Sequence, residues 1–190
     1  MNNNIKVQIV CVTYNQKNYI KDALNSFLMQ KTNFKFEVLV GDDCSNDGTT
    51  EIIVEYAKEY PDIIKHIHRE SNMGCLANFI DLCESITAKY VAFCDGDDYW
   101  TDENKLQKQF DFMEKNEDVN VCAHKVHVEC DKSCSNYAYY ANLPEAFTLP
   151  SKQKFSKKIT VNEIIQDLPQ MSSLFIRWQN IKFPNWSKEG

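Results

Sequence analysis

The chain has 190 residues, of which 43% are hydrophobic and 25% charged, values that are ordinary for a single globular domain. Its formal net charge of −6 is unevenly spread, because residues 1–149 carry 14 Lys and Arg against 24 Asp and Glu, whereas residues 150–190 carry 7 against 3. The acidic body argues against nucleic-acid binding, which needs a basic face, and no apolar run approaches the roughly 20 residues that span a bilayer.

The predicted elements alternate between strands and helices. Residues 6–12 are rich in β-branched side chains and predict a strand, and residues 18–30 carry apolar side chains at the spacing of one helix face. The pattern continues with strands at 34–40, 63–67, 90–94 and 119–128, and with helices at 47–60, 72–85 and 102–116. An irregular stretch at 130–158, a short helix at 160–166 and a strand at 172–177 follow. Strands separated by such helices indicate an α/β fold with a mostly parallel sheet.

Polar clusters follow each of the first four predicted strands. They lie at residues 13–15, 42–43, 72–74 and 95–98. Ligands bind beyond the carboxyl ends of the strands in sheets of this type. Because acids scattered at random over loops would not select one rim of a sheet, this placement predicts a functional site there.

The densest cluster places three carboxylates within four positions, at Asp95, Asp97 and Asp98. Like charges this close repel and raise each other's pKa, so a cation is expected among them. Oxygen ligands at a strand end suit Mg²⁺ or Mn²⁺, held by one or two carboxylates together with water and phosphate oxygens. The alternative is an acidic turn before a helix, with Asp102 as the N-cap.

Taken in order, these motifs resemble those of the family 2 glycosyltransferases, which have a GT-A fold. The resemblance covers residues 5–130 and continues more weakly through 171–177, which is similar to the family's acceptor-side strand. It implies a single α/β domain of GT-A type, with a nucleotide-sugar-binding core at 1–130 and a partial acceptor-side region at 131–190. The matching segments are Val12-Thr13-Tyr14-Asn15, residues 40–49, residues 72–78 and the DXD-type motif Asp95-Gly96-Asp97-Asp98.

The resemblance also implies residue roles. Asp43 corresponds to the acid that contacts the base, Tyr14 to a residue that flanks it, and Gly74 lets the backbone approach a phosphate at a helix N-terminus. For Asp42 a turn-capping role is the alternative, and for Tyr14 ordinary packing. The implied nucleotide-sugar-binding residues are Thr13, Tyr14, Asn15, Asp42, Asp43, Asn72, Gly74, Asn78, Asp95 and Asp97, and the implied ligands of a Mn²⁺ or Mg²⁺ ion are Asp97 and Asp98.

The activity implied by the resemblance is inverting transfer of a sugar, from a UDP-sugar, to a hydroxyl of a polysaccharide or lipid-linked glycan. Inversion needs a general base, which in the family lies beyond the strand similar to 172–177. Glu189 does not match its context, so we expect the base to be absent from this chain. The alternatives are a nucleotide-sugar-binding fragment without transfer, or a nucleotidyltransferase, whose Gly-rich basic loop is not matched by residues 13–16.

Two further features concern the cellular location of the protein and its cysteine residues. The N-terminus lacks a signal-peptide core, so we expect a cytoplasmic protein, with peripheral association at the inner face of the cell membrane as an option. Lys152, Lys154, Lys157 and Lys158 form a basic stretch suited to anionic lipid or a partner, or simply to solvent. Among the eight cysteines, Cys122, Cys130 and Cys134 lie near His124 and His127. These residue types could form a zinc site, but their spacing matches no common zinc pattern, and a strand running into a loop is the simpler interpretation.

Overall fold

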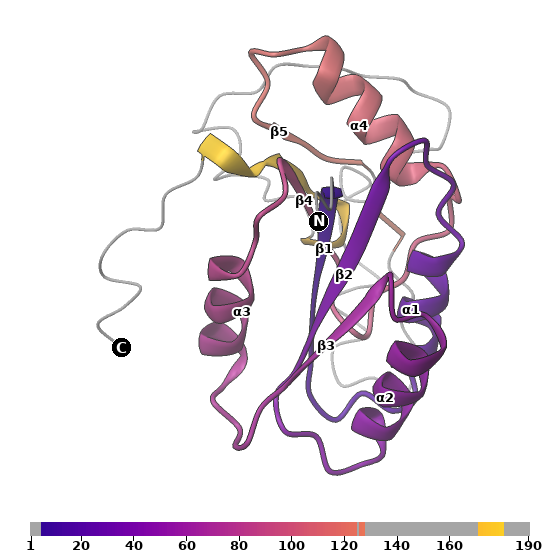
Figure 1. Ribbon diagram of the computed structural model, residues 1–190, viewed down its shortest axis with the longest axis vertical. Coiled ribbons are helices and arrows are strands. Elements are labelled where there is room, and N and C mark those ends of the chain that lie inside the picture. Colours follow the sequence, from indigo (N-terminus) through magenta and orange to yellow (C-terminus); the bar gives the residue numbers. More distant parts are fainter. Residues whose placement is uncertain (1–4, 125, 128–170, 181–190) are drawn as a thin grey trace.

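The computed structural model describes residues 5–124, 126–127 and 171–180. Its described strands form one six-stranded sheet in the order β3-β2-β1-β4-β6-β5 (Figure 1). The parallel strands are β1 (Ile5–Thr13), β2 (Lys35–Asp42), β3 (Ile64–His68) and β4 (Tyr90–Phe93). Strand β6 (Phe175–Arg177) runs antiparallel to both β4 and β5 (Val121–Cys122). The predicted α/β fold with a mostly parallel sheet is confirmed.

Four helices cover the two faces of the sheet. They are α1 (Ile20–Leu28), α2 (Thr49–Glu59), α3 (Cys75–Glu84) and α4 (Lys105–Lys115). Helices α1, α2 and α4 contribute to the core on one face, and α3 packs against the other; Figure 1 shows α3 on the side opposite α1 and α2. Strand β1 is buried on both faces, because Val7 and Ile9 point into one core and Val10 and Val12 into the other. A continuous apolar run of this kind is typical of a central parallel strand.

The order of the strands creates a switch point beside β1. From β1 the chain moves through α1 to β2 and through α2 to β3, all toward one edge of the sheet. It then returns through α3 on the opposite face and places β4 on the other side of β1. The connections leaving β1 and β4 therefore run toward opposite edges of the sheet, and a crevice at this point is where open α/β sheets bind ligands.

Three details of the predicted elements are wrong. Among the described residues of the strand predicted at 119–128, only Val121–Cys122 form a strand. The strand predicted at 172–177 is shortened to Phe175–Arg177 and is preceded by a 3-10 turn, η1 (Met171–Ser173). Two carbonyls of that turn accept hydrogen bonds from the Trp100 and Gln109 side chains. The N-cap of α4 is Asn104, since the Asp102 carboxylate instead accepts the Asn104 N–H at 2.9 Å and pairs with Lys108. The irregular stretch predicted at 130–158 and the helix predicted at 160–166 lie outside the described residues.

None of the described helices has both the length and the apolar character needed to cross a membrane.

Arg177 anchors the antiparallel strand β6 to the rest of the fold. Its buried guanidinium donates to the Tyr90 hydroxyl at 2.6 Å and to the Met113 carbonyl at 2.7 Å, with longer bonds to the carbonyls of Asn116 and Val119. These carbonyls belong to the C-terminal end of α4 and the turn after it, where helix carbonyls lack partners within the helix. Arg177 therefore joins β6, β4 and α4 through one side chain.

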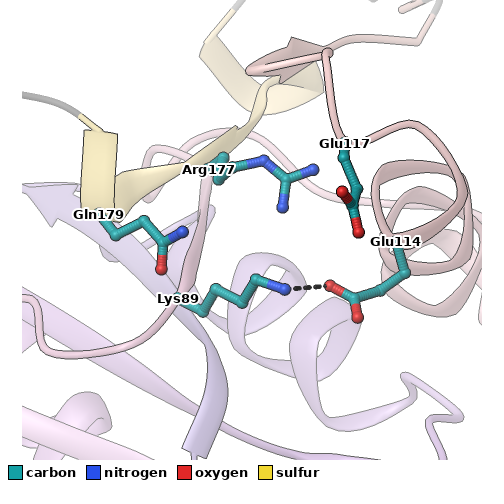
Figure 2. Close-up of a pocket in the computed structure, with 5 residues that line it drawn as sticks. All are labelled: Lys89, Glu114, Glu117, Arg177 and Gln179. Carbon is teal, nitrogen blue, oxygen red and sulfur yellow. Dashed lines mark hydrogen bonds and ion pairs between the residues drawn. The ribbon is translucent and has the colours of Figure 1, made fainter.

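A hollow of about 280 Å³ lies beside this anchor, lined by Lys89, Glu114, Glu117, Arg177 and Gln179. Figure 2 shows the basic side chains of Lys89 and Arg177 directed toward the acidic ones, and Lys89 pairs with Glu114 at 2.5 Å. Lys89 precedes β4 and Arg177 ends the antiparallel β6. The hollow therefore lies at the amino-terminal end of β4, away from the carboxyl ends of β1 and β4. Its charges balance one another, which indicates a structural network rather than a ligand site.

Replacing Arg177 by Met should lower the free energy of unfolding by roughly 2 to 4 kcal/mol, because it leaves buried carbonyls and the Tyr90 hydroxyl without their donor. Guanidinium unfolding followed by circular dichroism measures the change. Lys115→Met, at an exposed position in the last turn of α4, is the control and should stay within about 0.5 kcal/mol of wild type. Equal stability of the two variants would contradict the anchoring role.

Candidate functional site

The loops that follow β1, β2 and β4 meet at the switch point. The Gly96 N–H donates to the Val12 carbonyl at 2.9 Å, and the Asp43 N–H donates to the Thr13 carbonyl at 3.0 Å. Two acid-bearing loops are thus attached by backbone hydrogen bonds to the last two residues of β1. The predicted clustering of polar loops at one rim is found in the structure for these three connections.

The acid cluster forms a tight turn, closed by a hydrogen bond of 3.1 Å from the Asp98 N–H to the Asp95 carbonyl. A Cβ atom at Gly96 would lie 2.5 Å from Oε1 of Gln16 and 2.7 Å from Cβ of Thr13. A side chain there would collide with the end of β1, so glycine is what allows the turn to approach so closely. Asp97 is exposed at the surface of this turn, and Asp95 and Asp98 are partly buried.

Burial and mutual repulsion disfavour negative charge in this turn. Burial, followed by the charges of Asp98 and Asp97, raises the pKa of Asp95 to about 6. Burial also raises the pKa of Asp98, opposed by a hydrogen bond with the Ser172 hydroxyl and assisted by the charge of Asp97. Carboxylates held together at this energetic cost attract a compensating cation.

The residues present fit a divalent cation that shares its coordination with a ligand. Carboxylate oxygens are the donors that Mg²⁺ and Mn²⁺ prefer, and Mg²⁺ bound near phosphates takes only one or two of them from the protein. Within the described ranges no group of three or more His, Cys, Asp or Glu side chains is arranged to enclose a metal. The expected ligands Asp97 and Asp98 would therefore supply a partial shell, which phosphate oxygens and water would complete.

The residues after β1 are joined to the loop after β2. Asn15, which adopts a positive φ of 52°, donates its N–H to the Ser45 hydroxyl at 2.9 Å, and its side-chain oxygen accepts the Asn46 N–H at 2.9 Å. Thr13 is buried and donates its hydroxyl to Gln16 at 2.7 Å. Both residues therefore shape the rim. Tyr14 between them is 45% exposed, so its ring is available to a ligand.

Asp42 and Asp43 are both buried and both organise loops. The Asp42 carboxylate accepts hydrogen bonds from Ser45 and from the Thr50 hydroxyl, which is the turn-capping arrangement considered for it. The two carboxylate oxygens of Asp43 accept the N–H groups of Met73 at 2.8 Å and Gly74 at 2.9 Å. Asp43 thus ties the loop before α3 to the end of β2, and its contact with a base stays a prediction.

The loop before α3 lies at the same rim. Gly74 has a φ of 87°, which favours glycine, and its N–H is shared between Asp43 and the side-chain oxygen of Asn72 at 3.2 Å. Asn78 is only 1% exposed and donates to the Gly41 carbonyl at 2.8 Å, while its oxygen accepts the Arg69 Nε–H at 3.1 Å. Asn78 therefore supports the rim from below in the structure. Binding of a ligand by Asn72, Gly74 or Asn78 stays a prediction.

Sequence reasoning missed Ser172 as a site residue. Its hydroxyl is hydrogen-bonded to Asp98, and its carbonyl accepts the Trp100 indole N–H at 2.8 Å. These partners are more than 70 residues away in the chain, and no local pattern marks a serine for such a contact. Only the pairing of β6 with β4 brings this segment to the acid turn.

The cysteine and histidine residues considered as an alternative zinc site are only partly within the described residues. Cys122 ends β5 and has a free thiol whose pKa is raised to about 11, chiefly by burial. Cys130 and Cys134 lie outside the described residues. The zinc alternative therefore stays untested.

The sequence profile of the family described as Glycosyl transferase family 2 matches residues 8–177. The chain belongs to this family. Among curated proteins it is 44% identical over 122 residues to the uncharacterized protein Rv1520 of Mycobacterium tuberculosis, covering 64% of this chain and 35% of that protein. It is 36% identical over 107 residues to the putative teichuronic acid biosynthesis glycosyltransferase TuaG of Bacillus subtilis, covering 56% of this chain and 41% of TuaG. The chain thus spans well under half the length of these relatives.

Among solved structures, S. aureus TarS 1–349 in complex with UDP-GlcNAc aligns with a TM-score of 0.68 at 24% identity, covering 95% of this chain and 49% of that one. This likeness concerns the fold, and it confirms the GT-A expectation.

The raised pKa of Asp95 predicts a specific pH dependence. Because the pKa of about 6 lies above the ordinary value of 3.8, the stability linked to this group is present below pH 4 and is lost as pH rises through 6. Asp95→Asn removes the titrating group. Without divalent metal, its free energy of unfolding relative to wild type should therefore rise between pH 4 and pH 7.5, by about 2 kcal/mol.

Guanidinium unfolding at the two pH values measures this difference, in which the other titrating groups largely cancel. Asp111→Asn, at an exposed position of α4, is the control and should show little dependence on pH. A difference between Asp95→Asn and wild type that stays constant with pH would contradict the repulsion inferred for the acid turn.

Proposed function

We propose that the chain binds a nucleotide-diphosphate sugar, with UDP as the nucleotide, and serves sugar transfer to a hydroxyl acceptor. The observation that carries the proposal is the acid turn, whose repelling carboxylates are held against β1 at the switch point by the close approach of Gly96. A nucleoside diphosphate together with a divalent cation would complete a site of this kind. Family membership supports the reaction class, and the UDP-GlcNAc complex of TarS supports the nucleotide.

In the proposed complex, different residues of the rim contact different parts of the ligand. Asp97 and Asp98 hold a Mn²⁺ or Mg²⁺ ion, and Asp95 supports them from a more buried position. Tyr14, with its exposed ring, flanks the base, and the loop of Asn72 and Gly74, tied down by Asp43, lies beside the nucleotide. When bound, the ion supplies positive charge beside the two phosphates.

The proposed transfer exchanges one bond to the sugar for another. The acceptor oxygen forms a bond to the anomeric carbon, the bond from that carbon to the phosphate oxygen breaks, and the acceptor's proton passes to a base. The products are the glycoside and the nucleoside diphosphate. Inversion at the anomeric carbon and a polysaccharide or lipid-linked acceptor are part of the proposal, and no described residue is assigned as the base. Metal-dependent binding without turnover would instead favour the alternative of a donor-binding fragment.

Asp98→Asn should abolish the metal-dependent part of UDP binding, because the amide is a weaker ligand and carries no negative charge. Isothermal titration calorimetry with UDP, with and without Mn²⁺, measures the effect. We expect the Mn²⁺-dependent gain in UDP affinity to disappear, with the fold intact by circular dichroism. Asp62→Asn, an exposed acid far from the rim in the sequence, is the matched control. Equal affinities for the variant and wild type would refute the metal assignment.

A further inference from the structure

The segment before β6 runs alongside the acid turn. Strand β6 pairs antiparallel with β4, with Ala92 opposite Phe175, and the Leu174 carbonyl accepts the Phe93 N–H at 3.4 Å. Because β6 runs in the opposite direction, the residues that precede it lie beyond the carboxyl end of β4. The turn η1 is therefore brought to the rim by sheet pairing, and Figure 1 shows this segment beside β4.

Ser172 is attached to the acid turn at two points. Its hydroxyl is hydrogen-bonded to the carboxylate of Asp98, and its backbone carbonyl accepts the Trp100 Nε1–H at 2.8 Å. Asp98 and Trp100 are only two residues apart, and Ser172 itself is 7% exposed. The bond to Trp100 fixes the backbone of Ser172 beside the acid turn, and its hydroxyl is the group that engages Asp98.

The surroundings hold these contacts in place. Trp100 is 4% exposed and packs edge-on against Phe27 with ring centroids 5.1 Å apart, while Nζ of Lys105 lies 3.5 Å from the centroid of the indole ring. The next carbonyl in the segment, that of Ser173, accepts the Gln109 side-chain N–H at 3.0 Å. The serine is thus supported by α1, by α4 and by the turn that carries the acids, which gives it little freedom to move.

We propose that Ser172 is a positioning residue of the metal corner, which holds the Asp98 carboxylate in the orientation that binds the divalent cation. This inference rests on the proposed function. One hydroxyl engages a single lone pair of the carboxylate, and the other lone pairs stay available to the ion. Hydrogen bonds to metal-binding carboxylates from such outer partners set the orientation of the ligand and tune the affinity for the metal. Trp100 contributes indirectly, by fixing the backbone of Ser172.

The first test compares Ser172→Ala with Ser172→Thr, which keeps the hydroxyl. Calorimetry of Mn²⁺ binding to the UDP-saturated chain should show affinity weaker by about tenfold for Ser172→Ala, and recovery to within about threefold of wild type for Ser172→Thr. UDP affinity without metal should be the same in all three proteins. Ser26→Ala removes another buried hydroxyl, which donates to the Ala23 carbonyl at 2.7 Å within α1, and should leave Mn²⁺ affinity unchanged.

The second test uses Trp100→Phe, which keeps an aromatic ring and removes the N–H that holds Ser172. If both residues act through Asp98, Trp100→Phe alone should weaken Mn²⁺ binding, and the double variant should lose less than the product of the two single effects. This variant also decides the question if Ser172→Ala does not fold.

Unchanged Mn²⁺ affinity in both Ser172→Ala and Trp100→Phe, or equal losses of metal-free and metal-dependent UDP binding, would overturn the proposal for Ser172. If Asp98→Asn abolishes metal-dependent binding while these variants behave as wild type, only the role of Ser172 fails. If Asp98→Asn has no effect either, the metal assignment within the proposed function fails with it.

Discussion

The contact between Gly96 and the end of β1 is the constraint on which the arrangement of the site depends. It brings a turn with three acids to the switch point of the sheet, where burial and mutual repulsion keep the pKa of Asp95 near 6. Isolated buried carboxylates usually avoid this situation by pairing with basic side chains. Here the hydrogen bond of Asp98 with the Ser172 hydroxyl provides only partial relief, and a cation brought with an anionic ligand would relieve the repulsion more fully.

Much of the rim supports this turn rather than standing free for a ligand. Asp43 ties down the loop before α3, Asn78 holds both Gly41 and Arg69, and Asn15 joins the first two loops. A network of this kind orders backbone before a ligand arrives, and so reduces the conformational entropy that binding would otherwise cost. Among the predicted site residues, Tyr14, Asn15, Asn72 and Asp97 are exposed, and of these Asn15 and Asn72 use their side-chain oxygens to order the loops.

The sequence was sufficient for the order of the strands and helices, because the apolar patterns of β1, β2 and α1 are long and regular. It also located the acid turn and the loops at 13–15 and 42–43, since these follow directly from strand ends. Local patterns could not reveal that both oxygens of Asp43 are used by Met73 and Gly74, because that contact depends on how two crossovers pack. Ser172 escaped prediction for the same reason, as its partners are joined to it only through sheet pairing.

In the proposed site, the acid turn and a nucleoside diphosphate bind one divalent cation together. Calorimetric titration of the wild-type chain with UDP, once in the presence of Mn²⁺ and once with a chelator, tests it most directly. We expect UDP affinity to be at least about tenfold higher with Mn²⁺, and by linkage the same gain in Mn²⁺ affinity when UDP is bound. Equal UDP affinities under the two conditions would contradict it.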